Sequence, residues 1–432
     1  MKRLLLGIFI CIGITSIGLP VWARVTSVVA NKKTSNSICS AINSDQTRCH
    51  SKVITITENS SSQPDLPEQG ASMQVCSLPQ PAGYARCHSV VLVDNSAKPL
   101  VANIPSGYGP TEFRTAYQLT GTAKAPTTIA IVDAYDSPTI ENDLNVYSQT
   151  YGLPSCTTNN GCFTKVNQSG QQNNYPQTNA SWALEISLDV EVAHAICQNC
   201  KILLVEANSS SLYDLGIAEN TAAAQPGVTV ISNSYGAPEF QGETAYDSSF
   251  FNHPGITITV SSGDNGYGVQ YPAASPYVTA VGGTTLSLKS DNTRNSETVW
   301  SGSGSGCSVQ EPKPGWQIDN GCTGRTVVDV SADADPNTGA AVYDSTGTNP
   351  GWMVVGGTSL SAPLVAGIYA LAGNSGSNSK IGASYLYSNT SVPSLYNVTT
   401  GSNGNCGSYL CTGGPIYNGP TGLGTPIGTD AF

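Results

Sequence analysis

Short apolar runs alternate with segments of helical periodicity through most of the chain. The clearest run is Thr128-Ile129-Ala130-Ile131-Val132-Asp133, whose nearly continuous apolar character is typical of a strand buried on both faces of a parallel sheet. Further elements follow in alternation: a helix over residues 138–149, a helix over 182–196, a strand over 201–205, a helix over 212–221, and strands over 228–231 and 256–260. This order predicts an α/β fold with a mostly parallel sheet and helices on both faces.

The start of the chain has a different pattern. Basic residues at positions 2–3 precede an apolar run over residues 4–17, and Val21-Trp22-Ala23 places small residues where a signal peptidase cuts. This order predicts a secretory signal peptide over residues 1–23. A membrane anchor is the alternative, but the run is shorter than the ~20 residues that a spanning helix needs. We therefore expect a secreted, extracellular protein without membrane attachment after signal cleavage.

Residues 24–103 form an N-terminal segment with an internal repeat. Each copy carries two cysteines, and the second cysteine belongs to the same tetrapeptide, Arg48-Cys49-His50-Ser51 in one copy and Arg86-Cys87-His88-Ser89 in the other. An apolar strand is predicted directly after each copy, over residues 53–56 and 90–93. We interpret the two histidines as surface residues beside disulfides rather than as metal ligands.

The cysteines predict an oxidising compartment. Cys11, one of 13 cysteines, lies in the predicted signal peptide, so twelve remain, and they fall into six close pairs. We expect six local disulfides, between residues 39 and 49, 76 and 87, 156 and 162, 197 and 200, 307 and 322, and 406 and 411. A zinc or redox site is the alternative for Cys197-Gln198-Asn199-Cys200, but no second ligand pair follows at metal spacing.

Charge narrows the classes of partner. Only 11% of the 432 residues are charged, and the formal net charge is −11. Such a surface argues against binding to phosphate backbones, so no nucleic-acid partner is expected. Acid would reduce the self-repulsion of this chain before it built up a large positive charge, which favours tolerance of acidic surroundings.

The most informative stretch is Gly356-Gly357-Thr358-Ser359-Leu360-Ser361-Ala362-Pro363. It leads Ser359 into an apolar helical pattern over residues 364–371, so we expect the hydroxyl near a helix N-terminus, where free N–H groups favour developing negative charge. We expect Pro363 in the first helical turn, where its missing N–H would be unpaired in any case. An ordinary helix-capping serine or threonine is the alternative for this motif taken alone.

A second candidate lies on the helix predicted over residues 182–196. Glu185 and Asp189 are four residues apart and share one face, although like charges at this spacing oppose helix formation. A solvated acidic face is the ordinary interpretation, but the chain is poor in charge, and Trp182 and Ile186 flank the pair. Paired carboxyl groups that share protons or hydrogen bonds are a common source of a general base.

Asp264 is a third candidate, in a small-residue turn that follows the strand predicted over residues 256–260. Active sites of parallel sheets lie at the carboxyl ends of strands, although turns of this composition are common without function. Asp133 resembles the strand-end aspartate of subtilisin, but none of the four histidines lies in the His-Gly-x-x-His context of that family. A serine nucleophile needs a base, so we expect a carboxyl group in that role.

Together, Ser359 in Gly-Thr-Ser-x-x-x-Pro, the Glu185-x-x-x-Asp189 helix and Asp264 in Ser-Ser-Gly-Asp resemble the sedolisin family of serine-carboxyl peptidases, which have a subtilisin-like fold. The resemblance runs from about Tyr108 to the C-terminus. It implies Ser359 as the nucleophile and Glu185 as the base and later the acid. It also implies Asp189 as the group that orients Glu185, and Asp264 as the oxyanion donor.

The resemblance predicts a peptidase domain over residues 104–432, with residues 24–103 as a candidate short propeptide. The implied protein is a monomeric acid peptidase that cleaves protein or peptide substrates, with endopeptidase action expected ahead of tripeptidyl-peptidase action. A catalytically silent peptide-binding or surface protein is the alternative, although all four residues are retained. An ordinary subtilisin-type peptidase is disfavoured by the missing histidine motif.

Two features depart from the family pattern. The family usually has a long propeptide, so self-activation is not carried over to a segment of this length. The family also has a C-terminal calcium site, whose two aspartate positions correspond here to Asn397 and Asn418. Losing both charges should weaken calcium binding strongly, so we expect no metal and no cofactor to be required.

Overall fold

The computed structural model describes residues 38–43, 46–50, 70–77, 81–348, 350–373, 381–388 and 394–432. The chain divides into two units, Met1–Ser62 and Gln63–Phe432. In the first unit, β1 (Ile38–Asn43) and β2 (Gln46–His50) form an antiparallel pair in which Cys39 lies opposite Cys49. The described part of the chain does not include the side chains of this pair, and so not the disulfide predicted between residues 39 and 49. It also does not include the predicted signal peptide or the strand predicted over residues 53–56.

An eight-stranded sheet forms the centre of the second unit. Its order is β14-β13-β11-β9-β6-β8-β7, with β17 beside β13, and every pairing is parallel except that of β14 with β13. The strands are β6 (Thr128–Ala134), β7 (Phe163–Asn167), β8 (Lys201–Ala207), β9 (Val228–Asn233), β11 (Thr257–Ser261), β13 (Thr279–Leu288), β14 (Arg294–Val299) and β17 (Val330–Asp333). The predicted mostly parallel sheet is confirmed.

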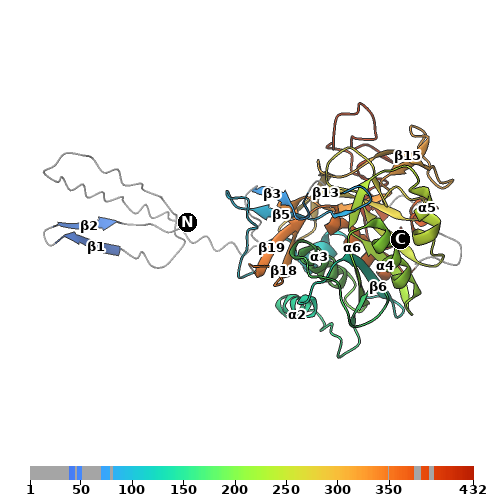
Figure 1. Cartoon of the computed structure of the whole chain (residues 1–432). Helices are drawn as coiled ribbons and strands as arrows, with labels where there is room; N and C mark the ends of the chain where they lie inside the picture. The colour runs from blue at the N-terminus through green and yellow to red at the C-terminus, as the bar shows by residue number, and fades with distance from the viewer. Residues whose placement is uncertain are drawn as a thin grey trace. The chain divides into compact units, whose positions relative to one another are not determined.

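Helices cover both faces of this sheet, as predicted. Ile129 and Ile131 of β6 belong to one hydrophobic cluster with residues of α3 and α6, whereas Ala130 and Val132 belong to another with residues of α4. Figure 1 shows α3 and α6 side by side in the middle of the unit. The helices are α1 (Pro110–Ala116), α2 (Ile140–Tyr151), α3 (Ala180–Ile196), α4 (Leu212–Ala224), α5 (Thr244–Tyr246), α6 (Thr358–Ala372) and α7 (Gly382–Ser388), with a π-helical turn (Asp247–Phe251) and a 3₁₀ turn (Pro336–Thr338).

The second cysteine repeat is part of the second unit, where smaller sheets pair it with the predicted peptidase domain. β3 (Ala71–Gln74) and β5 (Val90–Val93) join β19 (Gly351–Gly356) and β18 (Ala340–Asp344) in the order β18-β19-β5-β3, which Figure 1 shows as adjacent arrows. The remaining strands are β4 (Arg86–Cys87), β10 (Tyr235–Pro238), β12 (Gln270–Tyr271), β15 (Gly306–Pro312), β16 (Gly324–Val327), β20 (Leu395–Tyr396) and β21 (Thr425–Pro426). The boundary predicted near residue 103 therefore does not coincide with the division found after Ser62.

Five of the six predicted disulfides are confirmed. They join Cys76 to Cys87, Cys156 to Cys162, Cys197 to Cys200, Cys307 to Cys322, and Cys406 to Cys411. The Cys197 pair therefore forms the predicted disulfide, and its bonded sulfurs are not free to bind zinc. No helix in the described ranges combines the length and the apolar character needed to cross a bilayer.

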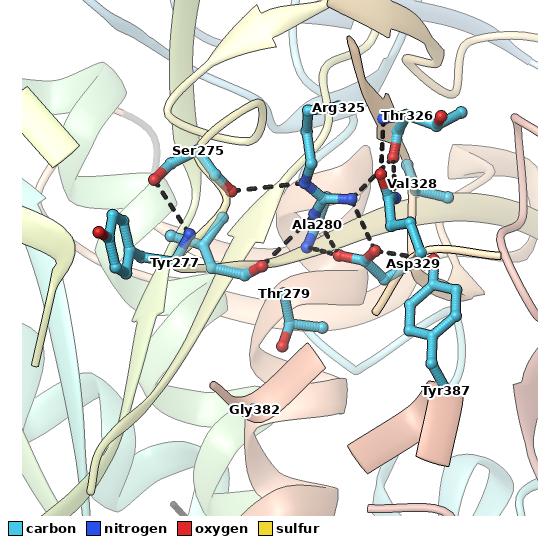
Figure 2. Close-up of polar contacts among 12 residues, drawn as sticks. Ser275, Tyr277, Thr279, Ala280, Arg325, Thr326, Val328, Asp329, Gly382 and Tyr387 are labelled. Carbon is cyan, nitrogen blue, oxygen red and sulfur yellow. Dashed lines mark hydrogen bonds and ion pairs between the residues drawn. The ribbon is translucent and has the colours of Figure 1, made fainter. Parts of the chain in front are cut away.

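A buried ion pair joins Arg325 of β16 to Asp329, the residue directly before β17. The guanidinium of Arg325 donates to both carboxylate oxygens of Asp329, at 2.8 Å for the Nη1–Oδ1 contact, and both side chains are fully buried (Figure 2). Asp329 Oδ2 also accepts the N–H of Ala280, and Asp329 Oδ1 accepts the hydroxyl of Tyr387. Because every carboxylate oxygen has a partner, the pair is a structural clamp and not a free charge.

Candidate active site

Ser359 is the second residue of α6, so it lies near a helix N-terminus as predicted. Gly357 precedes the helix with a φ of 92°, a left-handed conformation that favours glycine. The N–H of Ser359 donates to the carbonyl of His88 at 3.3 Å, and its hydroxyl donates to the carbonyl of Ser234 at 3.2 Å. The nucleophile candidate is fully buried in this arrangement.

Pro363 does not lie in the first turn, so that prediction is wrong. The helix begins at Thr358, which places Pro363 in the second turn. There its missing N–H leaves the carbonyl of Ser359 without a helical donor. The hydroxyl oxygen of Ser234, the residue directly after β9, lies 3.4 Å from this carbonyl, next to the nucleophile.

The carboxyl pair lies on α3, whose first turn is capped by Asn179 through the N–H groups of Ser181 and Trp182. Glu185 and Asp189 are both fully buried, so the solvated-face interpretation is wrong. Glu185 Oε2 accepts the N–H of Ser89 at 3.1 Å. Asp189 Oδ1 accepts the hydroxyl of Ser234 at 2.9 Å, which links the pair to the residue that also contacts Ser359.

Burial dominates the electrostatics of this pair. It raises the pKa of Glu185 to about 8, an effect opposed by the Ser359 and Ser89 hydroxyls and increased by the charge of Asp264. Burial, followed by the charges of Asp133 and Glu185, raises the pKa of Asp189 well above its usual value. A protonated Asp189 is a hydrogen-bond donor and can therefore hold an ionised carboxylate in place.

Asp264 contacts Thr358, the first residue of the helix that carries Ser359. Its Oδ1 accepts both the N–H and the hydroxyl of Thr358 at 2.8 Å, whereas its buried Oδ2 has no hydrogen-bond partner among the described residues. A Cβ on Gly357 would stand 2.8 Å from Asp264 Oδ2 and 2.0 Å from the carbonyl oxygen of His88. Glycine at this position therefore leaves room for a carbonyl oxygen beside the free carboxyl oxygen.

The state of Asp264 also depends on burial. Burial raises the pKa of Asp264 to about 7, while hydrogen bonds from Thr358 and the positive charge of Arg86 oppose the rise. In acid, well below this pKa, Asp264 is therefore protonated. Since Oδ1 is occupied by two donors, Oδ2 is the oxygen that carries the proton and can donate to an oxyanion.

The prediction that His88 lies on the surface is wrong. Its imidazole is fully buried between the hydroxyl of Ser261, at 2.7 Å from Nδ1, and the side-chain carbonyl of Gln270, at 2.9 Å from Nε2. Burial lowers the pKa of His88 to about 3, so the ring is neutral. The apolar strand predicted over residues 90–93 was the sequence feature that could have indicated this burial, because a buried strand brings the residues next to it into the core.

The remaining candidate ligands do not fit a metal. Cys156, Cys162 and His194 form the group of potential ligands found among the described residues, but the two sulfurs are joined in a disulfide. At the expected calcium position, the side-chain N–H₂ of Asn418 donates to the carbonyls of Val398 and Gly414, each at 3.1 Å. Both carbonyl oxygens therefore face the N–H₂ group of Asn418, where calcium would need another oxygen ligand. In this arrangement these residues do not fit calcium.

Comparisons with known proteins identify the family and the fold. The family model described as the subtilase family matches residues 170–405, more than half of the chain. Sedolisin from Pseudomonas sp. (strain 101) is 32% identical over 381 residues, covering 79% of this chain and 63% of the relative. Kumamolisin from Bacillus sp. (strain MN-32) is 31% identical over 366 residues, covering 75% of this chain and 63% of the relative.

The chain thus spans somewhat less than two thirds of the length of these relatives. The solved structure of Pseudomonas sedolisin, described as a serine-carboxyl proteinase complexed with two molecules of pseudo-iodotyrostatin, matches with a TM-score of 0.64 at 29% identity. That match covers 75% of this chain and 96% of the other. The chain therefore belongs to the subtilase family, and the predicted sedolisin-type member with a subtilisin-like fold is confirmed.

Proposed function

We propose that the chain is a serine-carboxyl peptidase that hydrolyses peptide bonds through an acyl-enzyme on Ser359. The observation that carries the proposal is the meeting of Ser359, Glu185 and Asp264 around one peptide group, that of His88 and Ser89. A hydroxyl, a buried carboxyl with a raised pKa and an unpartnered carboxyl oxygen are the groups that acyl transfer requires.

In the proposed reaction, Ser359 Oγ attacks the substrate carbonyl and its proton passes to Glu185. The oxygen of the tetrahedral intermediate accepts hydrogen bonds from the Ser359 N–H and from protonated Asp264. Glu185 then protonates the leaving amine, and later activates the water that hydrolyses the ester. Asp189 acts as the group that orients Glu185 through this cycle.

An acidic optimum is part of this proposal. Asp264 must be protonated and Glu185 ionised, yet burial holds the pKa of Glu185 at about 8 while the site is covered by residues 86–90. Opening the site exposes Glu185, which lowers its pKa toward the usual range of a carboxyl group. Asp264 then loses the opposing charge of Arg86 together with part of its burial, so the proposal requires that Glu185 ionise at a lower pH than Asp264 in the open site.

The finer parts of the proposal concern substrate and location. We propose endopeptidase action on proteins or peptides, because a chain that continues on both sides of the reactive carbonyl already fits the site. We also propose a secreted monomer without nucleic-acid partners or a required metal. The five disulfides of the described chain support the oxidising compartment.

The test is hydrolysis of denatured casein between acid and neutral pH by the full chain and by Ser359→Ala. We expect activity in acid that the substitution abolishes without lowering the melting temperature. Activity that survives the substitution would overturn the acyl-enzyme. If neither protein hydrolyses casein but both bind peptides, the silent peptide-binding alternative is correct.

A further inference from the structure

Residues 86–90 pass through the candidate active site as an extended chain. β4 pairs antiparallel with β10, so that Arg86 lies opposite Gly236 and Cys87 lies opposite Tyr235. The N–H of His88 continues this ladder by donating to the carbonyl of Ser234 at 3.1 Å. An extended peptide added to a strand beside the nucleophile is bound in the way that peptidases bind substrates.

The chain is also held on the far side of Ser359. The carbonyl of Ser89 accepts the N–H of Val75 at 3.0 Å, and Val90 pairs with Gly356 at the end of β19. His88 and Ser89 are fully buried, and so is Ser359. The segment therefore covers the nucleophile and excludes other substrates while it stays in place.

The His88–Ser89 peptide bond meets three reactive groups at once. Its carbonyl oxygen accepts the N–H of Ser359 at 3.3 Å and lies next to the unpartnered Oδ2 of Asp264, across the space that a side chain on Gly357 would fill. Its N–H donates to Glu185 Oε2 at 3.1 Å. The carbonyl thus accepts a hydrogen bond from one of the proposed oxyanion donors and lies near the other, and the N–H of the amine that would leave donates to the proposed proton donor.

We propose that His88–Ser89 is a substrate bond of this site and that the chain cleaves itself there. The inference rests on the proposed function and adds the bond that is cut. Ser359 Oγ forms an ester with the carbonyl carbon of His88, and its proton passes to Glu185. The C–N bond breaks as Glu185 protonates the amine of Ser89. Water then hydrolyses the ester, which leaves the carboxylate of His88 and restores the hydroxyl.

The cysteine pairing allows the cut to separate two pieces. Cys76 and Cys87 lie on the N-terminal side of the bond, and the other four disulfides of the described chain lie on the C-terminal side. None of these five crosses the bond between residues 88 and 89. After hydrolysis the N-terminal piece is held by noncovalent contacts alone, so the nucleophile can become accessible.

The pocket around His88 gives a side-chain preference. Ser261 and Gln270 hydrogen-bond the two ring nitrogens, and a Cβ on Gly236 would stand 2.7 Å from the ring carbon Cε1. The pocket therefore fits a flat, neutral side chain that forms hydrogen bonds at both ends. We expect substrates with histidine before the cut bond to be preferred over those with leucine, because leucine would leave Ser261 and Gln270 unpaired.

The experiment uses the full chain purified at neutral pH and then moved to acid. Timed samples are denatured, and the ends of the fragments are identified by mass spectrometry. We expect a fragment that begins at Ser89 in the wild type and none in Ser359→Ala. Because the bond lies in its own site, the rate constant should not depend on protein concentration.

Ser89→Pro is the variant that tests this bond most directly, because proline has no N–H to donate to Glu185 and its ring carbon takes the place of that hydrogen beside the carboxyl group. We expect cleavage to slow by at least ~10²-fold, the scale of a lost proton transfer. Ser51→Pro is the matched control, because Ser51 stands in the same Arg-Cys-His-Ser tetrapeptide of the first repeat. That control should cleave at the wild-type rate, and melting temperatures check that both variants fold.

The outcomes separate the two proposals. A wild type that hydrolyses casein while its bond between residues 88 and 89 stays intact overturns self-cleavage and leaves the peptidase proposal standing. A first cut at any other bond also overturns it. A chain that cuts neither itself nor casein fails both proposals.

Discussion

Each carboxyl group of the site uses one oxygen for a hydrogen bond and leaves the other without a partner among the described residues. The bonded oxygens are Glu185 Oε2, Asp189 Oδ1 and Asp264 Oδ1, and their opposite oxygens are the unpartnered ones. A buried, unsatisfied carboxyl oxygen is costly unless it serves another purpose. One half of each group is therefore anchored, and the other half is available to accept or donate a proton.

The first prediction at this scale compares the two carboxyls of α3. Glu185→Gln should lose nearly all activity, because an amide cannot take the serine proton. Asp189→Asn should lose less, because an amide N–H₂ can donate to an ionised Glu185 as a protonated Asp189 would. Measurement of kcat and KM on a peptide substrate checks this, with melting temperature as the control. Equal and mild losses would mean that neither carboxyl transfers the proton.

The second prediction concerns Asp264→Asn. An asparagine side chain donates a hydrogen bond at every pH, whereas Asp264 donates only below its raised pKa of about 7. We expect the alkaline limb of the activity profile to move upward in the variant. If the variant is active with an unchanged alkaline limb, the Glu185 and Asp189 pair titrating as a unit sets the limit. Loss of a single oxyanion donor costs about 10²- to 10³-fold in rate. We expect a loss of this size if the amide of the variant cannot reach the oxyanion.

At the scale of elements, local patterns predicted the central sheet and its helices. The apolar run over residues 128–133 became β6, and the periodic segment over 182–196 became α3, because burial of an apolar face is a local property of the sequence. β4 and β5 differ, since their partners β10 and β19 lie far away along the chain. The entry of His88 into the site follows from these distant pairings, which no local periodicity encodes.

The C-terminal loop around Asn418 carries the third prediction. Its amide N–H₂ bonds two carbonyls and its Oδ1 accepts the N–H and hydroxyl of Thr421, so the side chain itself ties the loop together. We expect chelators to leave the wild-type melting temperature unchanged. Asn418→Asp should lower it, because a carboxylate oxygen would then face two carbonyl oxygens, and added calcium should restore part of the loss.

Asn397→Asp is the control for that variant, since Asn397 is exposed and a new charge there should change the melting temperature little. A large drop in the wild-type melting temperature on chelation would show that other oxygens of the loop hold calcium. In that case the loss of both aspartates would not have removed the metal.

At the scale of the whole molecule, buried carboxyl groups couple folding to pH. Burial raises the pKa of Glu206 and of Glu219 to about 8, as it does for Glu185. In the unfolded chain these groups titrate near ~4.3. Between these values the folded state binds more protons than the unfolded state, so the free energy of unfolding falls as pH rises.

The fourth prediction is therefore a melting temperature that is higher near pH 4 than near pH 8. This contribution is fully present below the unfolded pKa and is lost as pH rises through the folded values. Calorimetry of Ser359→Ala checks it, because that variant cannot digest itself during heating. A melting temperature that rises steadily from acid to mild alkali would contradict it, and would mean that these carboxyls are ionised in the folded state.

The pairing of β3 with β5 has a consequence for how a cut chain would behave. Ala71 lies opposite Val93 and Gln74 lies opposite Val90, so strand pairs join the two sides of the bond after His88. A molecule nicked at that bond would keep its hydrodynamic size, and the nick would be silent in gel filtration under native conditions. Denaturant would release two polypeptides from the same peak. The rate of activation would then be set by the separation of β3 from β5, and not by the peptide-bond cleavage that precedes it. This separation is reversible, and dilution would favour it.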